Sequence, residues 1–229
     1  MKKLRNTLIL FQLSTCLFSC AFVPVNNQYE KAGTLQKGNM ELSGNFSGNS
    51  VTGGGDSEGI NNNLGFRFGY GISDKFDLKL RYERLMPTKA SEEDFSGANY
   101  FSIVPKIALI PGSMSLLIPI SRYSFKESYS DVEEKETLNS IAPQLLYTLT
   151  GIKKKTDFTF GFKADFLFGN GEEEDEGAAV IPGITVGAGF SSDLTRWAIR
   201  PELGASFLGG GAFLNYGVGV QYIISRKKR

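Results

Sequence analysis

Charged residues in this chain recur at every second position in several segments. In the clearest of these segments the charged set is Asp77, Lys79, Arg81 and Glu83. Two carboxylates held close together can carry out general acid–base chemistry, and Asp165 beside Glu83 or Glu202 would be a candidate pair. The lysine and arginine side chains nearby favour ion pairing inside a packed interior over catalysis, because opposite charges at this spacing neutralise one another.

The chain contains no histidine among its 229 residues. Histidine is the usual general base, the usual zinc ligand and the usual partner of a serine or cysteine nucleophile. If the chain were a membrane barrel, it would differ from the phospholipase, deacylase and protease types of barrel enzyme, because those enzymes depend on a histidine. The sequence therefore predicts a protein that is not an enzyme, with no catalytic residue, no bound metal and no cofactor.

The remaining charge features do not predict a specific ligand. The 25 basic residues are balanced by 24 acidic ones, which gives no electrostatic basis for binding nucleic acid. The acidic run "EEEDE" at 172–176 offers the carboxylate oxygens that divalent cations prefer, but it lacks the glycine and the alternating ligands of a calcium loop. We interpret it as a solvated acidic loop.

The alternation that positions these charges is typical of β-strands, in which successive side chains point to opposite faces. In the stretch at 62–85, apolar residues alternate with glycines and charges through two segments that are joined by the turn "SDK". Ten such segments follow one another, and none shows a sustained helical period: 39–48, 60–72, 76–86, 98–110, 114–126, 137–149, 156–168, 178–190, 195–208 and 212–224.

The connections between these segments alternate in length. The short ones are "SDK", "PGS", "GIKKK" and "SSDL", the long ones are "NSVTGGGDSEG", "PTKASEEDFSG", "ESYSDVEEKE" and "GNGEEEDEG", and only "GGG" at 209–211 departs from the rhythm. Outer-membrane barrels have long external loops, short periplasmic turns and an even number of strands. The sequence thus predicts an all-β fold, an up-and-down antiparallel transmembrane β-barrel of about ten strands.

One face of the predicted strands is apolar, and the opposite face mixes glycine with charges of both signs. In a narrow membrane barrel the mixed face must lie inside, where small residues leave room for long charged ones that pair across the lumen. The lumen is then largely filled by side chains. The predicted lumen-facing charges are Arg67, Asp77, Lys79, Arg81, Glu83, Lys106, Lys163, Asp165, Arg200 and Glu202.

Prolines within the predicted strands argue against a perfect hydrogen-bonded ladder. Each proline removes one donor, and a closed barrel has no edge strand on which that loss would be harmless. We therefore expect a bulge or a break at each of them. They are Pro105, Pro119, Pro143, Pro182 and Pro201.

The amino-terminal residues have the pattern of an export signal. A charged start and the short apolar run "LILFQLSTCLF" predict a signal peptide at 1–19. The boundary "LFSC" resembles a lipobox and predicts lipidation of Cys20, while the same letters also allow ordinary cleavage after Ala21. The aperiodic residues 20–38 then form a periplasmic tether, 39–224 the barrel, and 225–229 a basic tail.

Taken together, the strand pattern, "IRPELGASF" and "NYGVGVQY" resemble the small bacterial outer-membrane β-barrel superfamily, of the porin-like and opacity-type kind, over residues 39–224. The resemblance implies a place in the bacterial outer membrane, with outer-membrane lipids and the barrel-insertion machinery as partners. It also implies a set of residues that is similar to the signal read by the barrel-insertion machinery. The sequence "IISRKKR" follows this set in place of the usual terminal aromatic residue. That set is Asn215, Gly217, Val220 and Tyr222.

Three functions are compatible with these features. The first is a non-enzymatic barrel with a structural or surface-interaction role, whose surface ligand the residues do not identify. The second is a narrow porin for small solutes. The third is a soluble lipid-binding barrel anchored through a lipid on Cys20, in which the apolar face would point inward.

Overall fold

The computed structural model describes residues 23–53, 56–89, 96–125, 137–151, 155–169, 179–208 and 211–225. None of these residues forms a helix that is long and apolar enough to cross a membrane. Their regular structure is β-sheet, in twelve strands: β1 (Met40–Gly53), β2 (Asp56–Ser73), β3 (Phe76–Pro87), β4 (Ala98–Ile110), β5 (Met114–Leu117), β6 (Ile120–Phe125), β7 (Thr137–Ile141), β8 (Gln144–Thr150), β9 (Thr156–Gly169), β10 (Ala179–Phe190), β11 (Trp197–Leu208) and β12 (Gly211–Ile224).

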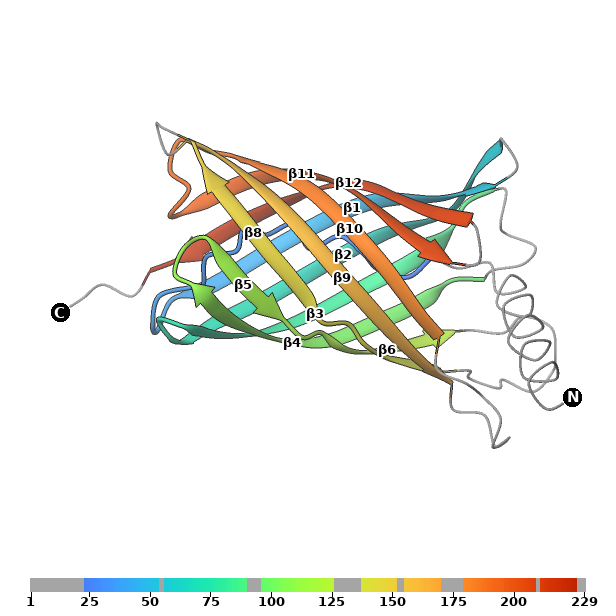
Figure 1. The fold of residues 1–229 in the computed structure, drawn as a ribbon, viewed down its shortest axis with the longest axis horizontal. Coiled ribbons are helices and arrows are strands. Elements are labelled where there is room, and N and C mark those ends of the chain that lie inside the picture. The colour runs from blue at the N-terminus through green and yellow to red at the C-terminus, as the bar shows by residue number, and fades with distance from the viewer. Residues whose placement is uncertain are drawn as a thin grey trace, which may run out of the picture.

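The strands form one closed antiparallel barrel (Figure 1). Strands β1 to β4 and β9 to β12 pair with their neighbours in sequence, and β1 pairs with β12 from Met40 opposite Ile224 to Thr52 opposite Ala212, which closes the ring. Strands β5 and β6 lie end to end between β4 and the β7–β8 pair, and β7 and β8 lie end to end beside β9. The barrel therefore has ten staves, two of which are interrupted, and the predicted up-and-down fold is confirmed.

The two interruptions lie at prolines. Ile118 and Pro119 separate β5 from β6, and Ala142 and Pro143 separate β7 from β8. The inward phase of the alternation continues through both breaks, and the Ala142 N–H still donates to the carbonyl of Pro119 at 2.9 Å. Each pair of short strands is therefore one stave with a local gap.

The other three prolines do not interrupt their strands and shift no register, so no bulge forms there. The expected local break is seen at Pro201, where β10 pairs with β11 at Gly187 and Glu202 and next only at Phe190 and Ile199. Pro105 lies opposite Leu78, Pro182 opposite Ala164 and Pro201 opposite Val218, each without a shift of register. In an antiparallel sheet a residue donates its N–H toward only one of its two neighbouring strands. A proline therefore removes a single bond, and the rest of the ladder keeps its register.

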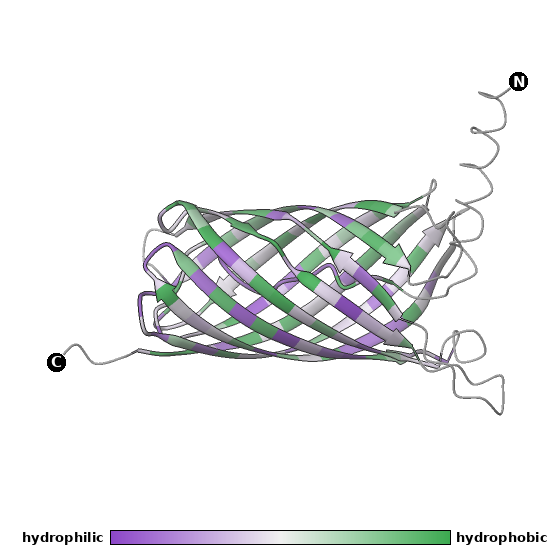
Figure 2. Cartoon of the chain, turned by 90° about the horizontal axis from the view of Figure 1, so that it is seen from below, coloured by the Kyte–Doolittle hydropathy of each residue, from purple (hydrophilic) through white to green (hydrophobic). Residues whose placement is uncertain are grey.

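The two faces of the barrel differ in polarity, as Figure 2 shows in the alternating colours along each strand. In β9, Phe158 and Phe162 point outward, the latter with 61% of its surface exposed, whereas Thr159 and Lys163 are buried in the lumen. A soluble lipid-binding barrel needs the opposite arrangement. An apolar outer surface around a polar interior suits a barrel that crosses a bilayer, so the protein is an outer-membrane β-barrel, in the location that the sequence predicts.

The two ends of the barrel also differ. The connections at 74–75, 111–113, 151–155 and 191–196 are short, and they lie at the same end as the start of β1 and the end of β12 (Figure 1). The opposite end carries the long connections β3–β4, β6–β7 and β9–β10. The predicted long connection between the first two strands was wrong, because β1 and β2 extend to Gly53 and from Asp56 and leave only two residues between them. In outer-membrane barrels short turns face the periplasm and long loops face the outside, which orients this molecule.

The amino-terminal residues lie in a place that the sequence did not predict. Residues 23–38 were expected to form a tether outside the barrel, but most of them are buried, including Val23, Asn26, Tyr29, Glu30 and Ala32. They contain no strand, and they run through the lumen. We call residues 23–38 the plug, and its contacts with the wall are the main feature of the interior.

Candidate functional site

The plug runs along the barrel axis from the long-loop end to the turn end. Near the long-loop end the Val25 N–H donates to the Tyr123 hydroxyl at 3.1 Å, and Lys163 Nζ donates to the Val25 carbonyl at 2.9 Å. At the turn end the Leu35 N–H donates to both carboxylate oxygens of Asp77, at 2.9 and 3.0 Å. These side chains replace the strand ladder that would otherwise satisfy the main chain of the plug.

A kink at Tyr29 is held by the carboxylate of Glu202. Tyr29 has a φ of 53°, in the left-handed region, which costs a residue with a side chain about 1–2 kcal/mol. This turn directs the N–H groups of Gln28 and Tyr29 to the two oxygens of Glu202, at 2.7 and 2.8 Å. Charge-assisted hydrogen bonds of this kind are stronger than neutral ones, so Glu202 compensates for the local strain.

The wall is made of glycine where the kinked segment passes close to it. A Cβ atom placed on Gly219 would lie 2.6 Å from Tyr29 Cβ, and one on Gly204 would lie 2.6 Å from Asn26 Nδ2. Gly217 is similarly close to the Tyr29 hydroxyl. The glycines that the sequence places on the inner face therefore make room for the plug as well as for charged side chains.

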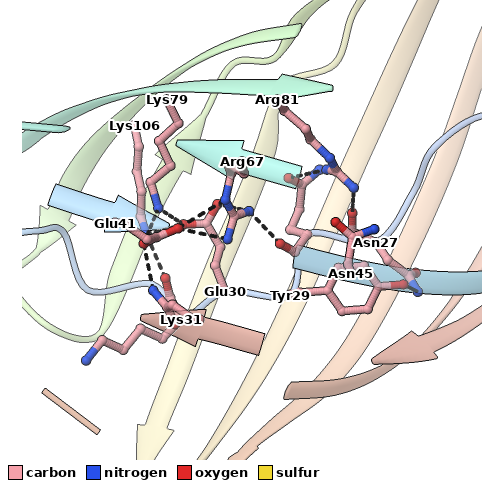
Figure 3. A network of polar contacts seen from close by, with 12 residues as sticks. Asn27, Tyr29, Glu30, Lys31, Glu41, Asn45, Arg67, Lys79, Arg81 and Lys106 are labelled. Atoms are coloured by element: carbon pink, nitrogen blue, oxygen red, sulfur yellow. Dashed lines mark hydrogen bonds and ion pairs between the residues drawn. The ribbon is translucent and has the colours of Figure 1, made fainter. Parts of the chain in front are cut away.

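The middle of the plug carries Glu30, which lies within an ion cluster (Figure 3). Glu30 Oε2 lies 2.6 Å from Lys79 Nζ and 2.8 Å from Lys106 Nζ, and its Oε1 lies 3.2 Å from Arg67 Nη1. A second carboxylate, Glu41 of β1, contacts Arg67 at 3.0 Å and Lys79 at 3.1 Å. We call Glu30, Glu41, Arg67, Lys79 and Lys106 the central ion cluster. All five are buried.

Lys106 shows how strongly the wall depends on the plug. Its ammonium group donates to Glu30 Oε2 and also to the carbonyls of Lys31 and Gly33, at 2.6 and 3.0 Å. All three of these acceptors belong to the plug. A buried ammonium without partners is strongly unfavourable, so the wall and the plug stabilise each other.

Two apolar clusters complete the packing of the plug. Val25 packs in a cluster near the long-loop end with wall residues that include Leu85 and Tyr123. Ala32 packs in a second cluster with Val104, Leu117 and Leu146. The plug thus makes apolar contacts with the wall at two levels, and Glu30 of the central ion cluster lies between them in the sequence.

The structure places all ten predicted lumen charges inside the barrel, where they are buried. Seven of them bind the plug: Arg67, Asp77, Lys79, Arg81, Lys106, Lys163 and Glu202. The other three bind wall residues: Glu83, Asp165 and Arg200.

The partners of these charges form the expected cross-strand network only in part. Arg67 pairs with Glu41 and Arg200 with Asp157 across strands, whereas other charges have partners that were not expected. Arg81 pairs with Glu83 and Lys163 pairs with Asp165, each two residues along the same strand. Asp77 and Glu202 bind main-chain N–H groups of the plug. Residues on one face of a strand recur every second position, about 6.7 Å apart, so long charged side chains can also reach a neighbour along the same strand.

Three carboxylates of the interior were missed by the sequence analysis. Glu41 and Asp157 lie on the inward phase of their strands, and Asp157 pairs with Arg200 at 2.7 Å. Extending the alternation to β1 and to the start of β9 would have found both. Glu30 lies in an aperiodic segment, which carries no comparable signal.

The insertion-signal-like residues are divided between the two faces. Asn215 is buried in the lumen, where it donates to Asn49 Oδ1 at 2.6 Å, and Gly217 faces the plug. Val220 and Tyr222 are exposed on the outer surface. The role of this set in barrel insertion stays a prediction.

Two other predicted features, Cys20 and the acidic run 172–176, lie outside the described residues. Among the residues that the structure describes, no group of three or more acidic, histidine or cysteine side chains could hold a metal ion. The interior chemistry of the described residues is therefore ion pairing and hydrogen bonding between the wall and the plug.

Comparison with known proteins gives a likeness in fold at low sequence identity. No protein-family model matches the chain, and no curated protein matches it. The solved structures that are similar include the N-terminal β-barrel domain of OprF from Pseudomonas aeruginosa, with 11% identity over 82% of this chain and 98% of that chain and a TM-score of 0.40. The COG4313 outer membrane channel from Pseudomonas putida F1 has 12% identity over 88% of this chain and 100% of that chain, with a TM-score of 0.47.

A third similar structure is the outer membrane protein OprG from Pseudomonas aeruginosa, with 11% identity over 86% of this chain and 100% of that chain and a TM-score of 0.33. These likenesses concern the barrel alone. The strand pairing and the polarity of the two faces establish that fold independently. The chain has the fold of an up-and-down antiparallel β-barrel with an apolar outer surface and a polar interior.

Proposed function

We propose that this protein is a non-enzymatic outer-membrane barrel with a structural or surface-interaction role, whose lumen is closed by its own plug. The observation that carries the proposal is the burial of the plug within the lumen, with Glu30 bound to three cations of the wall. Solutes would need a continuous aqueous path, and the two apolar clusters around Val25 and Ala32 oppose one.

The proposal is tested by conductance in planar lipid bilayers. The purified wild-type protein should show very low conductance. The double variant Arg81→Ala/Lys163→Ala removes two side chains that hold plug carbonyls, those of Asn27 and Val25. We expect this variant to open discrete channels, because the change loosens the plug and enlarges the space beside it.

Arg200→Ala is the matched control. Arg200 is also buried, and it forms an ion pair with Asp157, but its recorded partners belong to the wall. This variant should conduct as little as the wild type if it keeps the heat-modifiable gel mobility of a folded barrel. Large, stable channels in the wild type would overturn the proposal and favour a narrow porin.

A further inference from the structure

The plug starts at the end of the barrel that carries the long connections. The Val23 N–H donates to Asn61 Oδ1 at 3.3 Å, and Asn61 pairs with Pro87, the last residue of β3. Val25 contacts Tyr123, two residues before the end of β6. Both contacts lie at the end of the barrel that carries the long connections.

The other end of the plug lies at the turns. The Thr34 hydroxyl donates to the Asp74 carbonyl at 2.8 Å, and the Lys37 N–H donates to Asp74 Oδ1 at 3.0 Å, within the β2–β3 turn. The chain then enters β1 at Met40, which pairs with Ile224 at the end of β12. The start of the plug and the end of the last strand are therefore at opposite ends of the barrel.

We propose that the plug is an additional crossing of the outer membrane and that the amino terminus of the mature protein is exposed at the cell surface. With an even number of staves alone, both termini would lie in the periplasm. The plug adds one crossing through the lumen, which moves the amino terminus to the outside and leaves the carboxyl terminus in the periplasm. Hydrogen bonds between the plug and Asn61, Tyr123, Lys163, Glu202 and Asp77 of the wall hold this crossing at successive depths, with Lys163 as a donor and the other four as acceptors.

This topology fixes the leaflet that a lipid on the chain would enter. Cys20 precedes Val23 by three positions, and an extended chain of that length spans at most about 11 Å. The apolar band of an outer-membrane barrel is about 25 Å tall. A lipid on Cys20 therefore cannot reach the periplasmic leaflet while the plug is in place, and it would insert into the outer leaflet from the surface.

The direct test is thiol labelling of intact cells with a membrane-impermeant maleimide. Phe22→Cys should react in intact cells. The matched control is Ser225→Cys, at an exposed residue directly after β12, which should react only after the outer membrane is permeabilised. The wild-type protein is the background control. A lipidated or removed Cys20 offers no thiol to the maleimide, and an unmodified Cys20 would report on the same end of the plug as residue 22.

A second measurement covers the case in which a thiol at residue 22 is sterically protected. A short epitope is inserted between Ala21 and Phe22, and the same epitope is placed after Arg229 in a separate variant. Antibody should bind the first epitope on intact cells and the second only after permeabilisation. An amino-terminal epitope or thiol that is reached only after permeabilisation, or an epitope that is never reached in a heat-modifiable barrel, overturns the proposal.

The outcome is independent of whether the lumen conducts. A protein that is labelled at residue 22 on intact cells but forms large channels in bilayers would contradict the closed-lumen function and keep the topology. A protein that does not conduct, but whose amino terminus is accessible only from the periplasm, would contradict the topology and keep the closed lumen.

Discussion

Glu30 concentrates the electrostatics of the interior in a single side chain. It contacts two lysines and one arginine of the wall, while the second carboxylate of the cluster, Glu41, contacts only Arg67 and Lys79 among the cations. Desolvation of these charges is costly, and opposite charges with good geometry offset the cost. Removing Glu30 would leave three buried cations with one carboxylate among them.

At the residue scale we expect Glu30→Ala to destabilise the folded barrel by about 3–5 kcal/mol, the usual effect of deleting one partner of a buried ion pair. The measurement is the urea midpoint of unfolding, followed by the gel mobility of unheated samples. Glu58→Ala, at an exposed side chain in β2, is the control and should leave the midpoint unchanged. An equal midpoint in both variants would mean that Glu30 does not neutralise the cluster.

At the scale of the strands, most of the wall was predictable from the sequence. A period of two fixes which residues of one strand share a face, so the alternation within each strand separately located Lys79 in β3, Lys163 in β9 and Arg200 in β11. All ten staves were placed, and the breaks at Pro119 and Pro143 were expected from the missing proline donor.

The plug could not be predicted in this way. Its main chain is satisfied by side chains from several strands, which gives no sequence period. Its polar residues, such as Asn27 and Gln28, resemble those of a solvated linker until the wall that surrounds them is known. The pairing of Arg81 with Glu83 within one strand was missed for a related reason, because alternation specifies a face and does not specify a partner.

Strand β9 provides the sharpest test of the two faces. Phe162 is on its outer face with 61% of its surface exposed, and Lys163 is the next residue, on the inner face. We expect Phe162→Arg to impair assembly severely, since an arginine at the bilayer midplane costs about 2–4 kcal/mol in such barrels. The measurement is the fraction of protein that resists urea extraction from outer membranes and shows heat-modifiable mobility.

Phe162→Leu is the matched control for the loss of the aromatic ring, and it should assemble normally. Arginine and leucine variants that insert equally well would show that residue 162 does not face lipid. The outward assignment of β9 would then have to be abandoned.

At the scale of the whole molecule, the plug fills interior space that side chains alone would leave in a ten-stave barrel. Side chains fill an eight-stranded barrel, and each added strand widens it. Here a chain segment occupies the added space, with glycines such as Gly204 and Gly219 close to it. The filling of the lumen is therefore a property of two parts of one chain, and it depends on their remaining together.

Limited proteolysis compares the plug with the turns in a single experiment. Trypsin added to the folded protein in detergent should cleave after Arg196, whose side chain is 74% exposed in the β10–β11 turn. It should leave the bond between Lys31 and Ala32 intact, because Ala32 is fully buried and its N–H donates to Thr148 Oγ1 at 2.7 Å. Boiling before digestion should expose both sites. Cleavage after Lys31 at the same rate as after Arg196 in unheated samples would contradict a plugged lumen.

The pairing of β1 with β12 sets an order of events in biogenesis. The strand made first and the strand made last close the ring, and the plug directly precedes the first of them. If the amino terminus reaches the surface as proposed, the residues ahead of Val23 pass outward as an unfolded chain before the seam closes, since the plug occupies the lumen. An unstructured peptide fused ahead of the plug would be carried to the surface, whereas a domain that folds quickly in the periplasm would hold the seam open and stall assembly.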